Sequence, residues 1–229
     1  MERDSGSVAS YGQFCPIAQA AEILTERWTP IVLRELLSGS RRFNEIQNGA
    51  PTMSSSLLSK RLRTLEATGV IEHRDGEYRL TRAGEELRPM IEQMAVWGER
   101  WVRREVSRED ADAGLLMWAI RRSIRTDETP EERTVLHFHF RAAPQAKRCW
   151  WLVIDGPEVD MCLRDPGFDV DLTVHSEPHV LASVWMGDLS LAEALRRRTI
   201  RLQGPDHNVR AFPRWFGLSS VASIQRQAS

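Results

Sequence analysis

Apolar residues recur at helical spacing in the first part of the chain. Within residues 17–24 they stand at i, i+3, i+4 and i+7, the pattern of a helix with one buried face. Thr29 and Pro30 predict the start of a second helix, with Thr29 as its N-cap and Pro30 in its first position. Residues 41–47 form a short third segment, closed by a turn signal at Asn48-Gly49. Three consecutive short helices are therefore expected before residue 50.

A helix rich in basic and hydroxyl residues is expected next. Ser54 is a suitable N-cap for it, and Gly69 is a suitable stop. Its apolar face comprises Leu57, Leu58, Leu62 and Leu65. The other face has no acidic residue before Glu66 and carries Ser55, Ser56, Ser59, Lys60 and Arg63, with Arg61 flanking it.

A hairpin and a long helix complete the first half. Residues 70–74 and 77–81 have strand character and are joined by Asp75-Gly76, a strong turn signal. From Thr81, a capping residue, an amphipathic helix is expected to continue past residue 100. Pro89 should either kink this helix or lie near its first turns.

The second half changes to a period of two. Residues 133–141 and 168–174 alternate between apolar and polar side chains, which predicts half-buried strands. A further hairpin is expected around residues 155–157, and helical patterns cover residues 115–124, 180–186 and 190–197, with a strand near 200–202 and a terminal amphipathic helix. A polar, acidic stretch at residues 106–113 marks the change. We therefore expect an α+β protein of two domains, residues 1–106 and 107–229.

Composition narrows the class of protein. In 229 residues, 41% are hydrophobic and 28% are charged, which is ordinary for a soluble globular protein. No apolar run approaches the ~20 residues that span a bilayer, and the first ten residues do not resemble a secretory signal, so a cytoplasmic location without membrane contact is expected. Three scattered cysteines do not form a disulfide framework. The net charge of -1 leaves DNA binding open, because the position of the basic residues decides it.

The order of elements indicates a winged helix-turn-helix domain that binds double-stranded DNA. A helix fits the major groove, where hydroxyl and basic side chains reach base edges and phosphates, while a two-stranded wing reaches the backbone or the minor groove. A solvated helix face is the alternative explanation for such a basic patch. The expected contact residues are Arg41, Arg42, Ser54, Ser55, Ser56, Ser59, Lys60, Arg61, Arg63, Arg74 and Arg79.

Several blocks in this region resemble the HxlR family of bacterial regulators. They are Cys15-Pro16-Ile17-Ala18, Trp28-Thr29 and residues 31–37, 41–46, 53–54, 57–63, 65–66, 69–71 and 78–81. The resemblance covers residues 13–103. It implies a winged-helix homodimer whose terminal helices make the dimer contact and whose recognition helices enter successive major grooves of a palindromic operator, ~34 Å apart.

Short blocks in the second half resemble sterol-carrier-protein-like domains over residues 110–225. They are residues 149–153, 165–167, 170–172, 185–190, 200–204 and 210–213. This resemblance implies an α+β layer around an apolar cavity that holds a lipid-like effector. The candidate lining residues are also well suited to ordinary core packing: Trp185, Leu189, Phe212, Trp215 and Phe216.

Three other groups of residues have side chains that could form a site. His137 and His139 share a strand face, but no third ligand stands at a recognisable spacing, so no metal or cofactor is predicted. Asp169 and Asp171 are interpreted as the polar side of a strand. Cys15 precedes the first helix, whose N-terminus favours a thiolate, and it is either a redox switch or a small buried residue at the dimer surface.

The sequence therefore predicts a homodimeric, DNA-binding transcription regulator that is modulated by an apolar small molecule or by thiol oxidation. No nucleophile and base can be paired, and no phosphate-binding or hydrolase motif is present, so an enzyme is not expected. The alternative is a lipid-like ligand carrier whose helix-turn-helix contacts other proteins.

Overall fold

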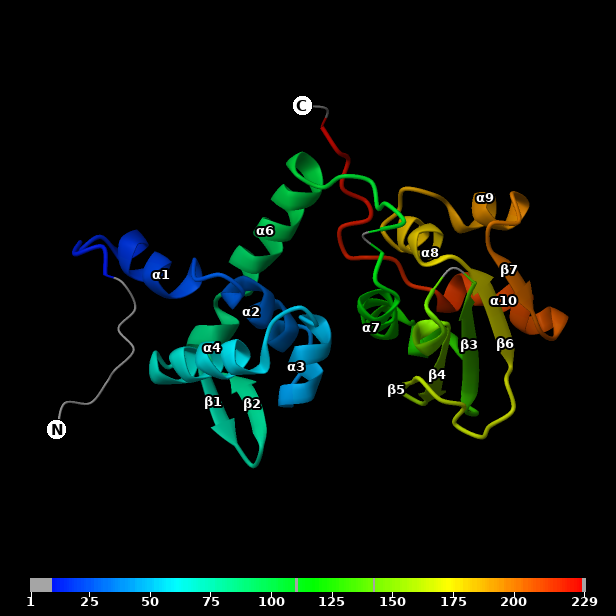
Figure 1. The fold of residues 1–229 in the computed structure, drawn as a ribbon, viewed down its shortest axis with the longest axis horizontal. Helices are drawn as coiled ribbons and strands as arrows, with labels where there is room; N and C mark the ends of the chain where they lie inside the picture. The colour runs from blue at the N-terminus through cyan, green and yellow to red at the C-terminus, as the bar shows by residue number, and fades with distance from the viewer. Residues whose placement is uncertain (1–9, 110, 142, 228–229) are drawn as a thin grey trace. The chain divides into compact units, whose positions relative to one another are not determined.

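The computed structural model describes residues 10–109, 111–141 and 143–227. The chain forms two compact units, residues 1–94 and 95–229 (Figure 1). The division falls inside one helix, whereas the sequence placed the domain boundary at residue 106. Each unit is mixed helix and sheet. Among the described residues, every helix is too short or too polar to cross a bilayer.

The N-terminal unit is built from helices and one hairpin. Its elements are α1 (Pro16–Leu24), α2 (Thr29–Leu37), α3 (Phe43–Gly49), α4 (Ser55–Ala67), β1 (Ile71–Arg74), β2 (Glu77–Leu80), α5 (Arg82–Glu85) and the start of α6 (Arg88–Trp101). The apolar faces of α2, α3 and α4 meet in one core, whose fully buried members include Val32, Leu33, Leu36, Ile46, Leu58, Leu62 and Leu65.

Local signals account for most of these elements. Ser54 Oγ accepts a hydrogen bond from the Leu57 amide at 3.3 Å, which confirms the expected N-cap of α4. Gly69 has a φ of 74°, a left-handed conformation that ends the helix region as expected. In the hairpin turn, Asp75 and Gly76 both have positive φ, at 53° and 78°, as a two-residue turn between twisted strands requires.

One expectation in this unit was wrong in detail, and another was confirmed at Pro89 although the helix around it is not continuous. Thr29 is the first residue of α2 rather than its N-cap; Trp28 takes the cap position, with a left-handed φ of 79°. The helix expected from Thr81 is divided into α5 and α6. Pro89 is the second residue of α6, and in an unbroken helix its ring would clash with the carbonyl of Glu85, the residue at which α5 ends.

The C-terminal unit is a five-stranded sheet with helices on one face. Its elements are α7 (Ala113–Ser123), β3 (Thr134–Phe140), β4 (Cys149–Asp155), β5 (Glu158–Cys162), β6 (Leu172–Ser176), α8 (Pro178–Trp185), α9 (Leu191–Arg196), β7 (Arg201–Gln203) and α10 (Asp206–Trp215). The strand order is β5-β4-β3-β6-β7, and only the β3–β6 pair within it is parallel.

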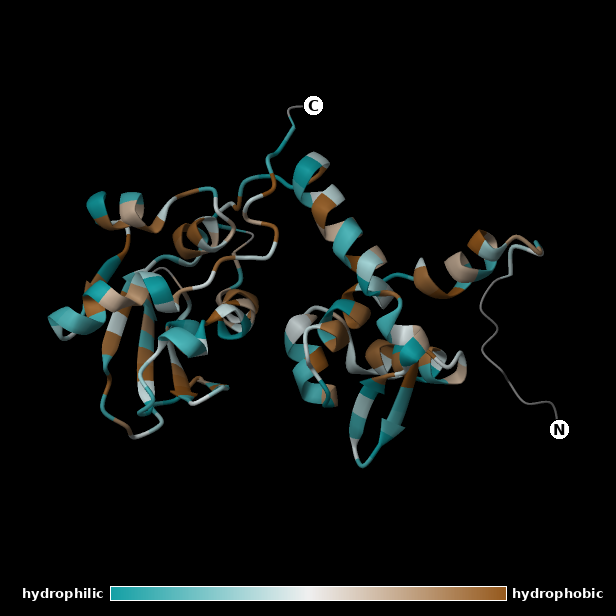
Figure 2. Ribbon diagram, turned by 180° about the vertical axis from the view of Figure 1, so that it is seen from behind, coloured by the Kyte–Doolittle hydropathy of each residue, from teal (hydrophilic) through white to brown (hydrophobic). Residues whose placement is uncertain are grey.

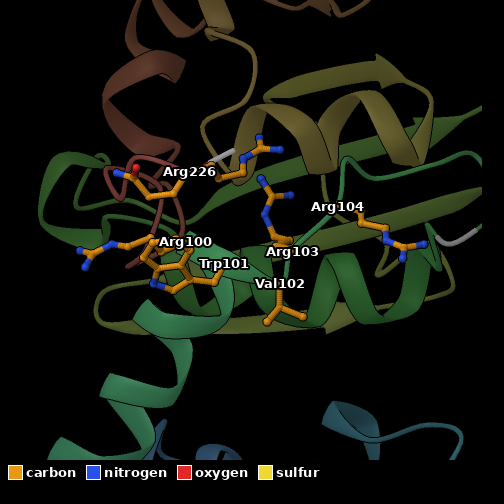
Figure 3. A pocket seen from close by; sticks show the side chains of 7 residues that line it. Arg100, Trp101, Val102, Arg103, Arg104 and Arg226 are labelled. Carbon is orange, nitrogen blue, oxygen red and sulfur yellow. The ribbon is translucent and has the colours of Figure 1, made fainter. Parts of the chain in front are cut away.

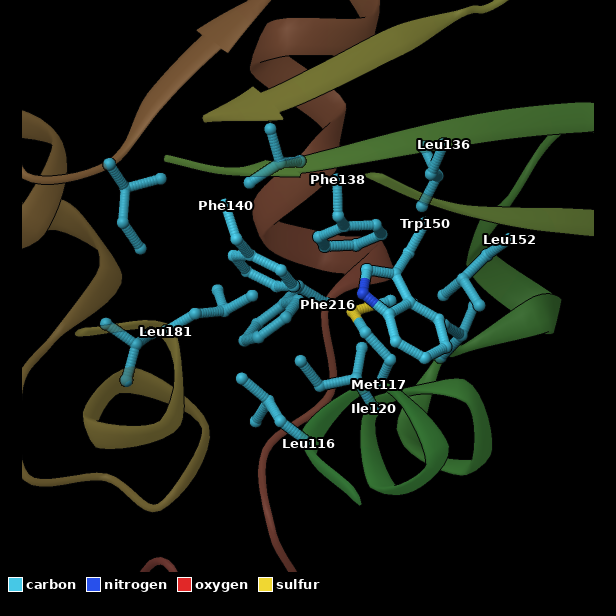
Figure 4. Packing of buried hydrophobic residues seen from close by; sticks show 14 of the residues in the cluster. Leu116, Met117, Ile120, Leu136, Phe138, Phe140, Trp150, Leu152, Leu181 and Phe216 are labelled. Carbon is cyan, nitrogen blue, oxygen red and sulfur yellow. The ribbon is translucent and has the colours of Figure 1, made fainter. Parts of the chain in front are cut away.

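The alternation along the strands sorts side chains between the two faces. Phe138 and Phe140 of β3 are fully buried and pack with residues of α7 and α8 and with Phe216 (Figure 4). His137 and His139 alternate with these two residues along β3, lie on the opposite face and are half-buried. Figure 2 shows the same alternation as brown and teal bands along the strands.

The strand expected at residues 168–174 begins later, at Leu172. Phe168 and Val170 are exposed in the preceding loop. This loop must carry the chain from edge strand β5 to the far side of β3, past two strands, so its residues cannot join the ladder. Asp171 ends the loop, and its Oδ2 accepts a hydrogen bond from the Val135 amide at 2.8 Å.

Candidate DNA-binding surface

Helix α4 presents a polar face to solvent. Its buried side consists of Leu58, Arg61, Leu62 and Leu65, and the preceding turn is held by Gln47, whose side-chain amide donates to the carbonyls of Ala50 and Met53 at 3.1 and 2.6 Å. On the other side, Ser54, Ser55, Ser56, Lys60 and Arg63 are exposed and Ser59 is half-buried. The structure therefore brings together six of the residues that the sequence proposed, on and just before one helix. We call these six residues the α4 face.

Two cations on the α4 face lack a carboxylate partner. Neither Lys60 nor Arg63 forms an ion pair within the described part of the chain. Other exposed arginines of the same unit, such as Arg82, are paired with a nearby glutamate. Unpaired cations beside small hydroxyl residues are suited to polyanion binding, because no internal ion pair must be broken first.

Arg61 does not belong to this surface. Its side chain is 9% exposed, its Nε donates to the Arg27 carbonyl at 3.0 Å, and its Nη2 pairs with Glu26 Oε2 at 2.5 Å. The guanidinium thus anchors α4 to the segment between α1 and α2. The expectation that Arg61 contacts DNA is wrong, because the residue lies on the buried side of the helix.

Arg41 and Arg42 have different surroundings although they are adjacent. The Arg41 side chain is half-buried and donates to the Leu36 carbonyl at 2.8 Å, so it caps the end of α2. Arg42 is exposed at the start of α3. Both backbone amides donate to Glu45 Oε2, at 2.7 and 3.0 Å, which fixes the first turn of α3. Only Arg42 offers an open guanidinium.

The wing carries both of its expected arginines in ion pairs. Arg74 pairs with Glu72 at 3.0 Å, and Arg79 pairs with Glu77 at 2.8 Å. The two guanidinium groups are 74% and 60% exposed, so these pairs contribute little to stability and can exchange for phosphate contacts. His73 stacks on Tyr78 at 4.2 Å and stiffens the hairpin between them.

A buried carboxylate holds the helices that support α4. Glu35 of α2 is fully buried; its Oε1 accepts from Arg34, whose Nη2 also donates to the Gly49 carbonyl at 2.8 Å. A Cβ at Gly49 would overlap the Glu35 carboxylate. The glycine at the end of α3 is therefore required for this close approach, which fixes α3 against α2.

Helix α6 exposes an apolar stripe. Met90, Met94, Trp97 and Trp101 follow one another at helical spacing and are between 40% and 61% exposed. Near the N-terminus, Phe14 and Ile17 are 96% and 79% exposed. Large exposed apolar groups at this spacing are typical of a protein–protein interface. We call the four residues of the helix the α6 stripe.

The expected ligand-lining residues are mostly core. Phe212, Trp215 and Phe216 are at most 3% exposed and pack in the cluster of the C-terminal unit. Trp185 and Leu189 are half-buried beside that cluster, and the Trp185 indole donates to Ser123 Oγ at 3.0 Å. Their burial agrees with ordinary core packing, the alternative to a ligand-lining role.

A depression of about 460 Å³ lies elsewhere in this unit (Figure 3). It is lined by Arg100, Trp101, Val102, Arg103, Arg104, Arg226 and Gln227. Arg103 pairs with Glu99 and Asp188 at 2.6 and 2.5 Å, and Arg226 also pairs with Asp188. A rim of arginines, two of them already paired with carboxylates, does not suit an apolar ligand.

The remaining candidates are placed as follows. Cys15 is the half-buried N-cap of α1, and all three cysteines are thiols. Asp169 lies in the loop before β6, so it does not share a strand face with Asp171. His137 and His139 do share one, and a third imidazole that sequence spacing did not connect to them, His175, is the cross-strand partner of His139.

Comparisons with known proteins agree with the geometry of the N-terminal unit. The HxlR-like helix-turn-helix family matches residues 23–106. Over 99 residues the chain is 36% identical to the HTH-type transcriptional regulator YvaP of Bacillus subtilis, covering 39% of this chain and 91% of the relative. It is also 36% identical over 102 residues to the HTH-type transcriptional regulator sll1512 of Synechocystis, covering 41% and 75%.

A crystal structure of quinone-bound YodB from Bacillus subtilis shares 31% identity, covering 38% of this chain and 98% of that one, with a TM-score of 0.35. The sequence relatives are named as transcriptional regulators. With a relative above 30% identity that is covered almost end to end, the chain belongs to the HxlR-like helix-turn-helix family.

Proposed function

We propose that this chain is a transcription regulator that binds a specific double-stranded DNA sequence through the α4 face. The single observation that carries the proposal is the exposure of Lys60 and Arg63, without carboxylate partners among the described residues, beside the serines of the same helix. An α-helix of this kind fits the major groove, where arginine recognises guanine edges and serine reaches bases or phosphates. Arg42, Arg74 and Arg79 are assigned to phosphate contacts.

The proposal includes a homodimer formed through the α6 stripe. Four large apolar side chains in a row are costly to leave in water, and a second copy of the same helix offers a matching surface. A two-fold dimer would place two α4 helices in successive major grooves ~34 Å apart, which implies a palindromic operator.

Binding is tested by selection from random-sequence DNA, followed by gel shifts at two salt concentrations. We expect recovery of a two-fold symmetric site and an affinity that falls as salt rises, with a slope of about -0.9 per phosphate contact. Failure to recover any preferred sequence, or a binding curve insensitive to salt, would contradict the proposal and favour a protein-binding role for the helix-turn-helix.

The dimer is tested by sedimentation of Trp97→Asp. This variant should be monomeric at concentrations where the wild type is dimeric, and should bind the selected operator more weakly. Phe168→Asp is the matched control, because Phe168 is an aromatic residue 43% exposed in a loop of the C-terminal unit. A dimeric Trp97→Asp protein would refute this interface.

We propose that a regulatory ligand binds the C-terminal unit. A lipid-like effector would enter beside the half-buried Trp185 and Leu189 and displace their contacts with the core around Phe212, Trp215 and Phe216. An effector that binds the folded state raises the unfolding temperature, and it regulates only if it also changes DNA affinity. Thermal shift and gel shift with a series of fatty acids and sterols measure both; no stabilisation by any of them would exclude this input.

Oxidation of Cys15 is the second proposed input. The half-buried thiol immediately precedes the first residue of α1, Pro16. Mild peroxide should modify Cys15 and change DNA affinity in the wild type but not in Cys15→Ser. A change of affinity with Cys15 unmodified in the mass spectrum would exclude it.

A further inference from the structure

Three histidines gather on the face of the C-terminal sheet that is opposite its helices. His137 and His139 stand two apart on β3, so their side chains point the same way. His175 of β6 is paired with His139 in the parallel ladder, and these two strands are neighbours in Figure 1. The chain thus brings together imidazoles that are 36 residues apart (139 and 175) in sequence.

The separations of the rings approach those of imidazoles that share one metal ion. The ring centroids of His139 and His175 are 5.4 Å apart, and those of His137 and His139 are 6.3 Å apart. Two imidazoles bound to one tetrahedral zinc ion, with Zn–N distances of ~2.0–2.1 Å, have centroids roughly 5 Å apart. One pair already has nearly this separation, and the second must close by about 1 Å.

Each ring also has one nitrogen that is buried and lacks a hydrogen-bond partner. These atoms are His137 Nε2, His139 Nδ1 and His175 Nδ1, and no described residue bonds to any of them. Buried polar atoms are rarely left unsatisfied, and three on one small patch call for an explanation. A metal ion accepts lone pairs from neutral imidazoles and would satisfy all three at once.

The other nitrogens of two rings meet groups that can set the tautomer. His175 Nε2 lies 3.2 Å from Gln203 Oε1, which can accept only if that nitrogen carries the proton, and this leaves the lone pair on Nδ1. His137 Nδ1 lies 3.5 Å from Thr173 Oγ1, and its ring stacks on Trp151 at 4.7 Å. Such outer contacts orient the ligands of known metal sites.

The charges around the rings favour neutral imidazoles. Burial lowers the pKa of His137 and of His139, and the neighbouring His175 lowers both further. Arg141 and Arg148 also lower the pKa of His139, while Asp165 acts in the opposite sense at His137. The two arginines also repel cations, so an ion must gain its affinity from nitrogen ligands. That requirement selects zinc, nickel or copper over calcium and magnesium.

We propose that His137, His139 and His175 form a binding site for one divalent transition-metal ion of the zinc class. Within the described residues the present side-chain positions do not form a ready three-ligand site. Binding therefore involves rotation of the imidazoles toward a common point. Three histidines are the donor set of one class of zinc site that keeps an open position.

The test is a titration of untagged, full-length, reduced protein with Co²⁺, followed by competition with Zn²⁺. We expect the visible absorption of tetrahedral cobalt at one ion per chain, and its loss when zinc is added. His175→Gln should weaken binding at least tenfold, since even outer-shell changes weaken metal sites about 10–100-fold. Gln203→Leu should weaken metal binding by about 10–100-fold, as other outer-shell changes do.

His207→Gln is the matched control, because His207 is an exposed histidine on α10, a helix of the same unit. Circular dichroism checks that each variant is folded. The site is refuted if the wild type gives no tetrahedral spectrum. It is also refuted if folded His175→Gln binds as the wild type does, or if His207→Gln loses as much affinity as His175→Gln.

Discussion

The α4 face and the histidine face of the C-terminal sheet (His137, His139 and His175) bring their polar side chains together in different ways. On α4, Ser55, Lys60 and Arg63 come from one helix, stand within nine residues (55 to 63) and point outward through helical spacing alone. On the sheet, His139 and His175 meet only because β3 and β6 pair in parallel. A functional surface on one helix can be read from local spacing, whereas one on a sheet depends on strand order.

The two surfaces also differ in what supports them. The α4 face rests on the buried Glu35 and Arg61, two charged side chains held by hydrogen bonds. The histidine face rests on an apolar layer, in which Phe138 lies between His137 and His139 along β3. Substitutions beneath the α4 face should therefore destabilise the N-terminal unit through lost hydrogen bonds. Substitutions beneath the histidine face should destabilise the C-terminal unit through lost apolar packing.

The largest effect is expected from Phe138→Ala. Removing this fully buried ring should lower the free energy of unfolding of the C-terminal unit by ~3–5 kcal/mol, through lost burial and a residual cavity. Denaturant unfolding measures the loss, and operator affinity should remain near that of the wild type. An equal loss of DNA binding would show that the two surfaces are not separable.

Arg61→Ala should have the next largest effect, on stability rather than recognition. It removes charge-assisted hydrogen bonds to Glu26 and to the Arg27 carbonyl, worth ~1.5–3 kcal/mol. Lys60→Ala, at the adjacent exposed position, should change the free energy of unfolding by less than ~0.5 kcal/mol. Equal stability of the two variants would contradict the burial of Arg61.

Substitution of the wing arginines should have a smaller effect. Arg74→Ala and Arg79→Ala each break only an exposed, solvent-screened ion pair, so the free energy of unfolding should change little. If each contacts a phosphate, the slope of log affinity against log salt should become less steep by ~0.9 per substitution. Gel shifts over a salt series measure this, and an unchanged slope would remove the wing from the interface.

The smallest effect concerns pH. The pKa of His137 and of His139 lies below the ordinary 6.5 because burial disfavours the charged ring. Between the depressed pKa and 6.5 the unfolded chain binds more protons, so the free energy of unfolding should fall as pH drops below about 6.5 and level off below the folded pKa.

The combined His137→Gln and His139→Gln substitution should flatten this pH dependence. A residual slope should remain from His179, whose pKa burial also lowers. If the double variant kept the wild-type pH dependence of its free energy of unfolding, the assignment of this dependence to His137 and His139 would be contradicted. Metal-free protein is required for the measurement.

The sequence predicted the N-terminal unit well because its signals are local. The Ser54 cap, the Asp75-Gly76 turn and the break near Pro89 each act within a few residues. Arg61 was misplaced although a signal existed: it stands three residues after Leu58 and four before Leu65, on their side of the helix. Its positive charge suggested an exposed position, and the sequence does not show that the distant Glu26 is its ion-pair partner.

The sequence predicted the C-terminal unit less completely. Alternation identified β3, but it also assigned Phe168 and Val170 to a strand, because a crossing loop can alternate by composition alone. His175 could not be joined to His137 and His139, since parallel pairing across more than thirty residues leaves no spacing rule. The sequence alone predicts no metal site, because the third histidine is brought near the other two only by the pairing of β3 with β6.

The most direct test of the central claim is the operator affinity of Arg63→Ala compared with that of Arg82→Ala. Arg82 is also an exposed arginine of the N-terminal unit, but it lies on α5 rather than on α4 and is paired with Glu86. Fluorescence anisotropy at one fixed salt concentration should show a loss of ~1–3 kcal/mol for Arg63→Ala if the residue reads a base edge. Arg82→Ala should remain near the wild type. A loss below ~0.3 kcal/mol for Arg63→Ala, or an equal loss for both variants, would contradict recognition through the α4 face.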